Sequence, residues 1–260
     1  MKLNKKYLDS LLEFSRKIAI DSSEITMKYF KPGRIKSTLK KDRSPVTIAD
    51  LKCEDYLLKQ IKAIYPSHNI LSEENGVHEN GSEFRWLVDP IDGTRNFMRG
   101  YPFWGTLLAV EYQGEVVMGI ISMPAIGVFI YASAGKGCFL NGKRVRVSKI
   151  DKIKESYVLY SGLHHILLRN FGNNFLKLTS QCSYSRGFGD CHGHSFIISG
   201  MAEILIDPIV APYDIAATKI CVEEAGGRLT DIHGIDSIYN KTAVITNGLV
   251  HDNVLEILNS

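Results

Sequence analysis

The sequence predicts a layered α/β fold built from two lobes, residues 1–150 and 151–260. In the first lobe, apolar runs separated by Gly-containing turns predict the hairpins of an antiparallel sheet. In the second lobe, short apolar runs alternate with helical spacings, which predicts helices packed on a mixed α/β layer. The composition becomes charged around residues 149–156, and we place the boundary there, between two lobes of one integrated domain.

Two helices are expected at the start of the first lobe. Apolar residues recur every three or four positions from residue 4 to 30, and again from Thr47 to the residue before Pro66. Strands are expected where short apolar runs end in turn residues. The expected strands are residues 67–72, 86–88, 106–112, 116–122, 128–132, 137–140 and a short run that contains Val145 and Val147.

The second lobe is expected to begin with a strand at residues 157–161 and a helix at 164–178. A Gly-rich link at 186–189 separates this helix from one at 193–200. The remaining expected elements are a strand at 203–206, a helix from Asp214 to Gly226-Gly227, strands at 228–230 and 243–245, and a closing helix.

The bulk composition limits the class of protein. With 260 residues, of which 45% are hydrophobic, the chain can fill a large core. A net charge of +3 does not indicate a nucleic-acid or membrane surface, and the five cysteines lack the C-x-x-C spacing of zinc sites. We expect a cytoplasmic protein without a targeting or membrane-spanning segment. One basic cluster, expected to be a solvated loop or an attractor of an anionic substrate, comprises Arg34, Lys36, Lys40, Lys41 and Arg43.

Acidic side chains stand at the edges of four separate predicted elements. Asp89 and Asp92 lie in a tight Asp-Pro-Ile-Asp-Gly-Thr turn after a strand, Glu73 follows another strand, and Asp50 and Asp214 begin helices. Carboxylate oxygens are the ligands that Mg²⁺ prefers, so convergence of these acids predicts a metal site. Taken singly, Asp50 and Asp214 could instead be helix N-caps, and Glu73 a surface turn acid.

Three motifs stand out in the sequence: Glu73-Glu74, Asp89-Pro90-Ile91-Asp92-Gly93-Thr94 with Asn96-Phe97, and Tyr213-Asp214-Ile215-Ala216-Ala217 with Glu224-Ala225-Gly226-Gly227. Together they resemble the inositol monophosphatase family of Mg²⁺-dependent, lithium-sensitive phosphatases, over roughly residues 5–255. The resemblance implies an αβαβα sandwich, a homodimer, and a phosphomonoesterase that hydrolyses a small phosphate ester with two or three Mg²⁺ ions. Tyr213 and Thr218 depart from a frequent Trp and Gly of the family, and we expect them to leave the metal ligand intact and to affect the packing around that helix.

The resemblance also assigns the metal ligands. Glu73, Asp89 and the backbone carbonyl of Ile91 would hold one Mg²⁺, and Asp89, Asp92 and Asp214 would hold a second. Two ions placed in this way serve both the attacking and the leaving oxygen of an in-line displacement.

Three further roles follow from the resemblance. The hydroxyl of Thr94, polarised by Asp50, would orient the attacking water. Glu74 would lie near that water or near a weaker third ion. The backbone amides of Gly93 and Thr94 would bind the phosphate at the start of a helix.

The choice of phosphate ester depends on two further acids, Asp190 and Asp207. In the family the position of Asp207 carries an acid that contacts the substrate, and two acids together favour a cationic amine or imidazole. The segments 95–100, 104–107 and 189–190 look more like the histidinol-phosphatase branch, which implies hydrolysis of L-histidinol phosphate in histidine biosynthesis. Inositol monophosphate, a nucleotide or sugar bisphosphate, and binding without turnover remain alternatives, and Asp190 could be an Asx-turn acid.

Four other polar or aromatic residues lie in the segments of interest. His192 and His194 are two positions apart, a spacing that favours polar side chains lining the site over metal ligands. Phe103 and Trp104 could wall the pocket or belong to the core.

Overall fold

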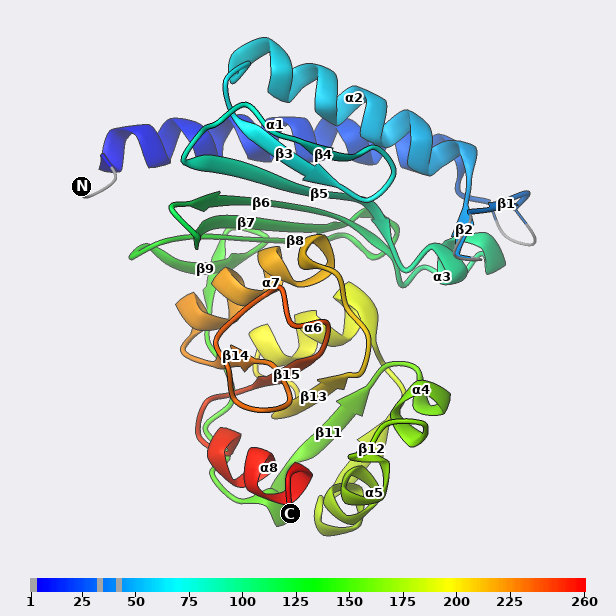
Figure 1. Ribbon diagram of the computed structural model, residues 1–260, viewed down its shortest axis with the longest axis vertical. Helices are drawn as coiled ribbons and strands as arrows, with labels where there is room; N and C mark the ends of the chain where they lie inside the picture. Colours follow the sequence, from blue (N-terminus) through cyan, green and yellow to red (C-terminus); the bar gives the residue numbers. More distant parts are fainter. Residues whose placement is uncertain (1–3, 32–34, 41–43) are drawn as a thin grey trace.

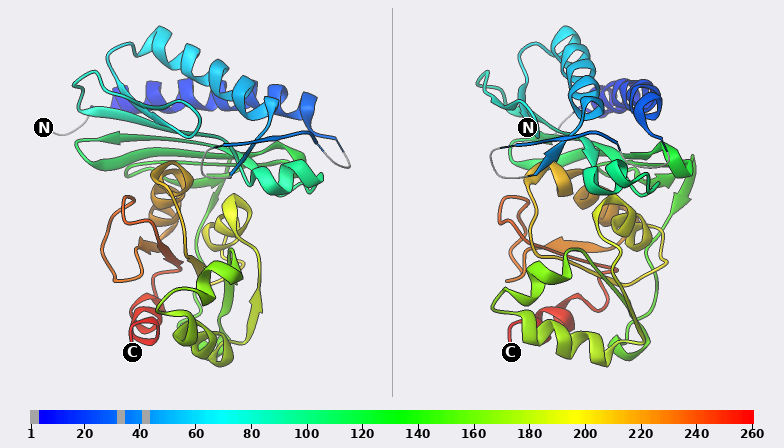
Figure 2. Two further views of the ribbon diagram at one scale, coloured as in Figure 1. Left: turned by 45° about the vertical axis from the view of Figure 1, so that its right-hand side comes forward. Right: turned by 90° about the vertical axis from the view of Figure 1, so that its right-hand side faces the viewer.

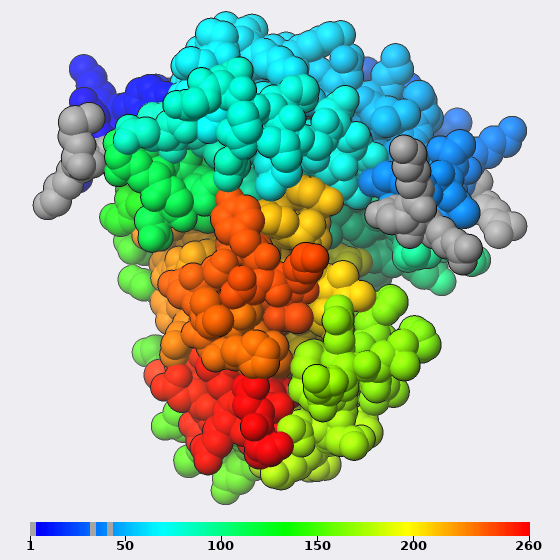
Figure 3. All heavy atoms as spheres, in the orientation of Figure 1, coloured from blue at the N-terminus to red at the C-terminus, as the bar shows by residue number. Residues whose placement is uncertain are grey.

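Figure 1 shows the computed structural model of the chain, in which residues 4–31, 35–40 and 44–260 are described. Within these residues, helices and sheets alternate in five layers: two long helices, an eight-stranded sheet, two helices, a five-stranded sheet and three shorter helices (Figures 1 and 2). In the space-filling view of Figure 3, the cyan part of the chain packs directly on the parts below it. The predicted αβαβα sandwich is confirmed.

Helices α1 (Lys5–Tyr29) and α2 (Ile48–Ile64) cover the outer face of the first sheet. Asn4 caps α1, since its side chain accepts a hydrogen bond from the Lys6 amide at 2.9 Å. Thr47 caps α2 in a capping box with Asp50, which fixes the direction of the first turn of that helix. The helices bury an apolar stripe against the sheet that includes Leu8, Leu11, Ile18, Leu57 and Ile61.

The first sheet has the strand order β10-β9-β8-β7-β6-β5-β3-β4 and is antiparallel except for the parallel pair β3 and β5. Its central strands are buried on both faces, which explains why they are nearly continuous apolar runs in the sequence. The strands are β3 (Asn69–Ser72), β4 (Gly76–His78), β5 (Phe84–Asp92), β6 (Gly105–Tyr112), β7 (Glu115–Met123), β8 (Val128–Ser133), β9 (Gly137–Leu140) and β10 (Lys143–Val145).

The second sheet has the order β12-β11-β13-β15-β14 and is mixed: β11 is parallel to β12 and β13, and the other pairs are antiparallel. Helices α6 (Asp190–Ile198) and α7 (Pro212–Ala225) lie between the two sheets and share a core with both. The strands are β11 (Tyr157–Tyr160), β12 (Tyr184–Arg186), β13 (Ile204–Asp207), β14 (Arg228–Thr230) and β15 (Ala243–Thr246), and the outer helices are α4 (Leu163–Leu167), α5 (Gly172–Gln181) and α8 (His251–Leu258).

The expected turn at residues 89–94 is wrong. Strand β5 continues through Asp92, which pairs with Gly105 of β6 after a bulge that follows Asp89. The short helix α3 (Thr94–Arg99) then begins directly after Gly93. A bulge turns a strand without ending it, so both acids are carried by a strand held in the sheet.

The expected single helix at 164–178 is also wrong, because the chain forms α4 and α5 with a break between them. Gly172 explains the break: a Cβ at this position would meet the Ile166 carbonyl oxygen at 3.0 Å, so the close approach of the two helices needs glycine. Strand β12 was not expected, and α6 and α7 begin earlier in the chain than predicted.

The described members of the basic cluster, Lys36 and Lys40, flank β1 (Thr38–Leu39), which pairs with β2 (Pro45–Val46). Arg34, Lys41 and Arg43 of that cluster lie outside the described residues. The chain passes from the first sheet to the second between β10 and β11, and the division into lobes 1–150 and 151–260 stays a prediction. No helix in the described part of the chain is both long and apolar enough to cross a membrane.

Candidate active site

The acids singled out in the sequence are carried by the ends of six elements. Strand β3 runs parallel to β5, and the Glu73 amide donates to the Val88 carbonyl at 3.1 Å, so Glu73 follows β3 beside Asp89. Asp50 and Asp214 lie in the first turns of α2 and α7. The remaining candidates are Asp92 in β5, Asp190 at the start of α6 and Asp207 at the end of β13.

Mutual repulsion shows how close these acids are. Burial, and then the charges of Glu73, Asp92 and Asp214, hold the pKa of Asp89 well above its usual range. Burial, and then Asp190 and Asp214, do the same for the pKa of Asp92. Such an accumulation of buried negative charge is costly unless positive charge compensates it.

The carboxylate of Asp214 is also buried among negative charges. Burial raises its pKa to about 8, a hydrogen bond from the Ala211 amide at 2.7 Å opposes that rise, and the charges of Glu73, Asp207 and Asp190 add to it. The charge of Asp214 therefore interacts both with a metal-site acid and with the two acids expected to meet the substrate.

Asp50 and Asp214 also accept hydrogen bonds from backbone amides at the starts of their helices, so the alternative in which they act as capping residues is partly correct. Asp50 accepts from the Thr47 amide at 2.8 Å and from the Thr47 hydroxyl, and Asp214 accepts from the Ala211 amide. Both occupy the third helical position of their helix and not the N-cap itself. These bonds fix the two carboxylates to the ends of their helices.

The hydroxyl of Thr94 lies between two acceptors. Its oxygen is 2.9 Å from the Ile91 carbonyl and 3.3 Å from a carboxylate oxygen of Asp50. A hydroxyl has one hydrogen to donate, so Thr94 donates mainly to the Ile91 carbonyl, which is the closer acceptor. The expected pairing of Thr94 with Asp50 is present in geometry, and the catalytic role of the pair stays a prediction.

Lys40 provides positive charge beside the candidate metal ligands, a contact that was not predicted from the sequence. Its ammonium lies 2.8 Å from Glu73 and 2.7 Å from Glu74, so this member of the basic cluster is not a freely solvated side chain. Burial raises the pKa of Glu74 to about 7 even though Lys40 acts to lower it.

Glu54 is a second residue of the site that was not predicted from the sequence. This fully buried side chain accepts from the Ser72 hydroxyl and from the backbone amides of Glu74 and Asn75, at 2.8 to 3.0 Å. It therefore holds the turn that presents Glu73 and Glu74. The available signal was its position four residues after Asp50, on the buried face of α2.

The chemistry of the donor set fits Mg²⁺. All the candidate ligands are hard oxygen atoms, and the raised pKa values of Asp89, Asp92 and Asp214 show that a bound cation would stabilise their charged forms. In the residues the structure describes, no three Asp, Glu, His or Cys side chains converge tightly enough to form a finished metal-binding group. Lys40, held by Glu73 and Glu74, is the nearby cation that the structure places among them.

Asp190 has an unusual backbone for a residue other than glycine. Its φ is 55°, a left-handed conformation that costs energy and is found where a side chain must be aimed. Its carboxylate accepts from the Asn96 side chain at 3.2 Å, and burial followed by the charge of Asp207 raises its pKa to about 6. This contact joins α6 to α3 and does not resemble an Asx turn, in which the side chain binds its own backbone.

Gly93 needs its hydrogen side chain. Its φ is 80°, and a Cβ there would lie 3.0 Å from the Phe103 carbonyl oxygen and 3.4 Å from an Asp190 carboxylate oxygen. The helical bonds of α3 begin with the Asn96 and Phe97 amides, both of which donate to the Gly93 carbonyl. The amides of Gly93 and Thr94 thus precede the first helical bond, as expected for groups that could bind an anion.

Phe103 and Trp104 were expected either to wall the pocket or to belong to the core, and the structure places the two residues differently. Trp104 is fully buried and packs against Phe97 in the core. Phe103 is 37% exposed, and its ring stacks on that of His192 with centroids 4.2 Å apart. His194 is buried and bonds to Asp207 at 3.3 Å, so it lies behind the site.

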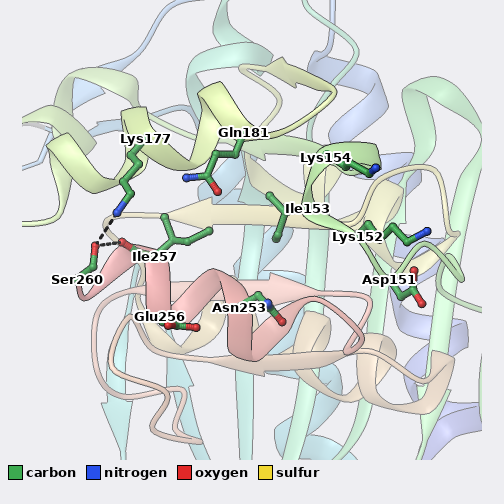
Figure 4. A pocket seen from close by; sticks show the side chains of 10 residues that line it. All are labelled: Asp151, Lys152, Ile153, Lys154, Lys177, Gln181, Asn253, Glu256, Ile257 and Ser260. Carbon is green, nitrogen blue, oxygen red and sulfur yellow. Dashed lines mark hydrogen bonds between the residues drawn. The ribbon is translucent and has the colours of Figure 1, made fainter.

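A cavity of about 570 Å³ lies elsewhere, between α5, α8 and residues 151–154 (Figure 4). Figure 4 shows side chains of both charges around it, Lys177 and Glu256 among them. None of the candidate site residues lines this cavity, so the acid cluster is not part of it.

The layered fold and the buried acids at its strand ends are the features of a metal-dependent phosphatase. The sequence model of the inositol monophosphatase family matches residues 7–260, and the chain belongs to that family. Its members are phosphatases of small phosphate esters that depend on metal ions, generally Mg²⁺. The resemblance drawn from the three motifs is thereby confirmed.

Two relatives carry different names. The histidinol-phosphatase of Chlorobaculum parvum is 35% identical over 235 residues, which cover 90% of this chain and 91% of that protein. The fructose-1,6-bisphosphatase/inositol-1-monophosphatase of Thermotoga maritima is 33% identical over 258 residues, with 95% of each chain covered.

The fold matches solved structures equally well. The structure of the Thermotoga maritima IMPase has a TM-score of 0.86 at 30% identity and covers 96% of this chain and 97% of its own. The inositol monophosphatase of Anabaena has a TM-score of 0.86 at 25% identity, with 97% and 96% covered.

Proposed function

We propose that this chain is a Mg²⁺-dependent phosphomonoesterase that hydrolyses L-histidinol phosphate to L-histidinol and phosphate. The observation that carries the choice of substrate is the pair Asp190 and Asp207, two acids whose charges reach each other and Asp214. A cationic ammonium or imidazole beside the phosphate ester would compensate both. The relatives named histidinol-phosphatase support this reading.

The proposal assigns Mg²⁺ to two sets of oxygen atoms, with room for a third ion near Glu74. Glu73, Asp89 and the Ile91 carbonyl form one set, and Asp89, Asp92 and Asp214 form the other. Bound Mg²⁺ would supply the charge that activates water and stabilises the leaving alkoxide.

The other residues orient the reactants. Thr94, with Asp50 beside it at 3.3 Å, would hold the attacking water in line with the phosphorus atom. The amides of Gly93 and Thr94 would receive the phosphate oxygens, and Asp190 with Asp207 would receive the cationic end of the substrate. The same proposal places the enzyme in histidine biosynthesis in the cytoplasm, as a homodimer.

Inositol 1-phosphate is the second candidate substrate, because an acid can also accept from the hydroxyl of a sugar-like ring. The name of the Thermotoga maritima relative favours it and adds a sugar bisphosphate. A comparison of kcat/KM on L-histidinol phosphate and inositol 1-phosphate, with Mg²⁺ present, separates the two. We expect at least about tenfold preference for the former, the effect of one charge-assisted hydrogen bond.

Asp92→Asn is the control for that experiment and should abolish turnover of every ester. Phosphate release that survives Asp92→Asn would come from a contaminating phosphatase. A preference for inositol 1-phosphate would reject our choice of substrate, and binding without turnover of any phosphate ester would reject the enzyme.

A further inference from the structure

His194 lies behind the acids that we assign to the substrate. Its side chain, on α6, is 1% exposed, and its Nε2 is 3.3 Å from a carboxylate oxygen of Asp207. Its Nδ1 is 2.8 Å from the hydroxyl oxygen of Thr218 on α7. Ser161, which follows β11, donates to the other oxygen of Asp207. The end of β11, helix α6 and strand β13 therefore meet at one carboxylate, and α7 is joined to them through His194.

The Asp207 carboxylate only accepts hydrogen bonds, so it favours an N–H on the Nε2 of His194 and leaves Nδ1 to accept from the Thr218 hydroxyl. A neutral imidazole has one N–H and one lone pair. When the hydroxyl donates to Nδ1, the hydrogen is left on Nε2, and that N–H donates to Asp207. With one oxygen bound to His194 and the other to Ser161, the Asp207 carboxylate cannot rotate freely.

A neutral donor preserves the charge of the acid that it orients. A Lys or Arg at position 194 would form an ion pair with Asp207 and cancel the attraction for a cation. An imidazole that donates through Nε2 and accepts at Nδ1 holds the carboxylate without adding a charge of its own. A carboxylate has about four lone-pair sites, so Asp207 can still accept from a substrate.

Thr218 thereby gains a role beyond packing. It is one of the two positions at which the sequence departs from the residues frequent in its family, and its fully buried hydroxyl bonds to His194 across the α6–α7 contact. A buried hydroxyl without a partner is costly, so Thr218 and His194 depend on each other.

We propose that His194, hydrogen-bonded to Thr218 through Nδ1, is a positioning residue that orients Asp207 toward a cationic group of the substrate and so contributes to substrate specificity. This inference rests on the proposed function. Neither residue touches the reacting atoms, so both act on substrate binding and not on the chemical step.

The first test compares two substitutions by steady-state kinetics on L-histidinol phosphate. His194→Leu removes the donor, and we expect KM to rise about tenfold with kcat within about twofold, since Asp207 loses one bond to a charged group. His194→Gln keeps a neutral N–H donor, and we expect its KM within about threefold of the wild-type value.

The second test asks whether His194 acts through Asp207. In the Asp207→Ala background, His194→Leu should change KM by less than about twofold, because the carboxylate that it positions is gone. A tenfold rise in both backgrounds would overturn the inference. So would a His194→Leu protein with wild-type KM and a lower melting temperature, which is the signature of a purely structural residue.

Thr218 provides a matched pair should His194→Leu fail to fold. Thr218→Val keeps the shape and removes the hydroxyl, whereas Thr218→Ser keeps the hydroxyl. We expect Val and not Ser to raise KM, by about threefold. Equal KM values for Val and Ser would contradict the role of the hydroxyl.

Failure of the proposed substrate is distinguishable from failure of this inference. If the wild-type protein hydrolyses inositol 1-phosphate and not L-histidinol phosphate, the proposed function is wrong. The same cycle of His194→Leu and Asp207→Ala, measured on inositol 1-phosphate, then still decides whether His194 positions Asp207.

Discussion

Asp207 is the buried carboxylate on which the proposed preference for a cationic substrate depends. It is 5% exposed, both its oxygens are bonded, and its charge acts on Asp190 and Asp214. Asp207→Asn keeps the shape and removes the charge. We expect kcat/KM for L-histidinol phosphate to fall about 10- to 100-fold, because a hydrogen bond to a charged group contributes roughly 1.5–3 kcal/mol.

Inositol 1-phosphate is the matched neutral substrate for Asp207→Asn, since its ring hydroxyls lose no charge pair. We expect a loss within about threefold for it. Equal losses on both esters in the same kinetic assay would make Asp207 a hydroxyl acceptor or a scaffold residue, and would contradict the cationic substrate.

The positions of the acids at the ends of elements could be predicted from the sequence, because they either follow a recognisable apolar run or begin a helical pattern. Their partners could not. Lys40 belongs to a basic segment that looks solvated, and only its fold places it 2.8 Å from Glu73. Likewise, Ser161 and Asp207 are joined by the parallel pairing of β11 with β13, which single-sequence periodicity does not encode.

The pairing of α8 with the second sheet depends on His251, a fully buried residue at the first position of that helix. Its ring nitrogens lie 3.0 Å from the Thr230 hydroxyl of β14 and 2.9 Å from the Thr246 hydroxyl of β15. Burial, and then Arg228, lower its pKa to about 4. The folded protein thus resists a proton that the unfolded chain accepts near pH 6.5.

We predict that stability falls as pH drops from about 6.5 to about 4 through this residue. Above pH 6.5 both states are neutral at His251, and below it the unfolded chain binds the extra proton, so the free energy of unfolding decreases. The size is about 3 kcal/mol. Urea unfolding of the wild type and of His251→Gln at several pH values measures it.

The difference between the two proteins is the informative quantity for His251. The acids of the candidate site also titrate, but they do so in both proteins and cancel in the difference. The wild-type advantage over His251→Gln should shrink toward pH 4. Parallel stability curves would show that His251 is protonated equally easily in the folded and unfolded chains.

At the level of whole elements, sequence periodicity predicts long helices and central strands well and their interruptions badly. The run at 164–178 has helical spacing throughout, yet Gly172 allows a close approach that breaks it into α4 and α5. Strand β12 has three residues on a sheet edge, too few for a clear alternation. Both misses arise from tertiary packing that overrides local pattern.

Across the whole molecule, the candidate site connects layers that are distant in the sequence. Asp89 and Asp92 come from the first sheet, and Asp214 comes from α7, which packs between the two sheets. A cation bound by all three would tie these layers together in the folded state alone. Binding to the folded state stabilises it in proportion to the logarithm of ligand concentration.

Mg²⁺ at about 100 times its dissociation constant should therefore stabilise the protein by about 2.7 kcal/mol. For a chain of 260 residues this corresponds to a rise in melting temperature of roughly 5–10 °C, which calorimetry can measure with and without EDTA. Asp214→Asn removes one of the three carboxylates, and the rise in its melting temperature with Mg²⁺ should be clearly smaller.

NaCl at equal ionic strength controls for screening of the repelling acids, because screening lacks coordination geometry. A melting-temperature rise of the same size in NaCl, or an unchanged Mg²⁺ effect in Asp214→Asn, would mean that the acids repel each other without forming a cation site across the layers.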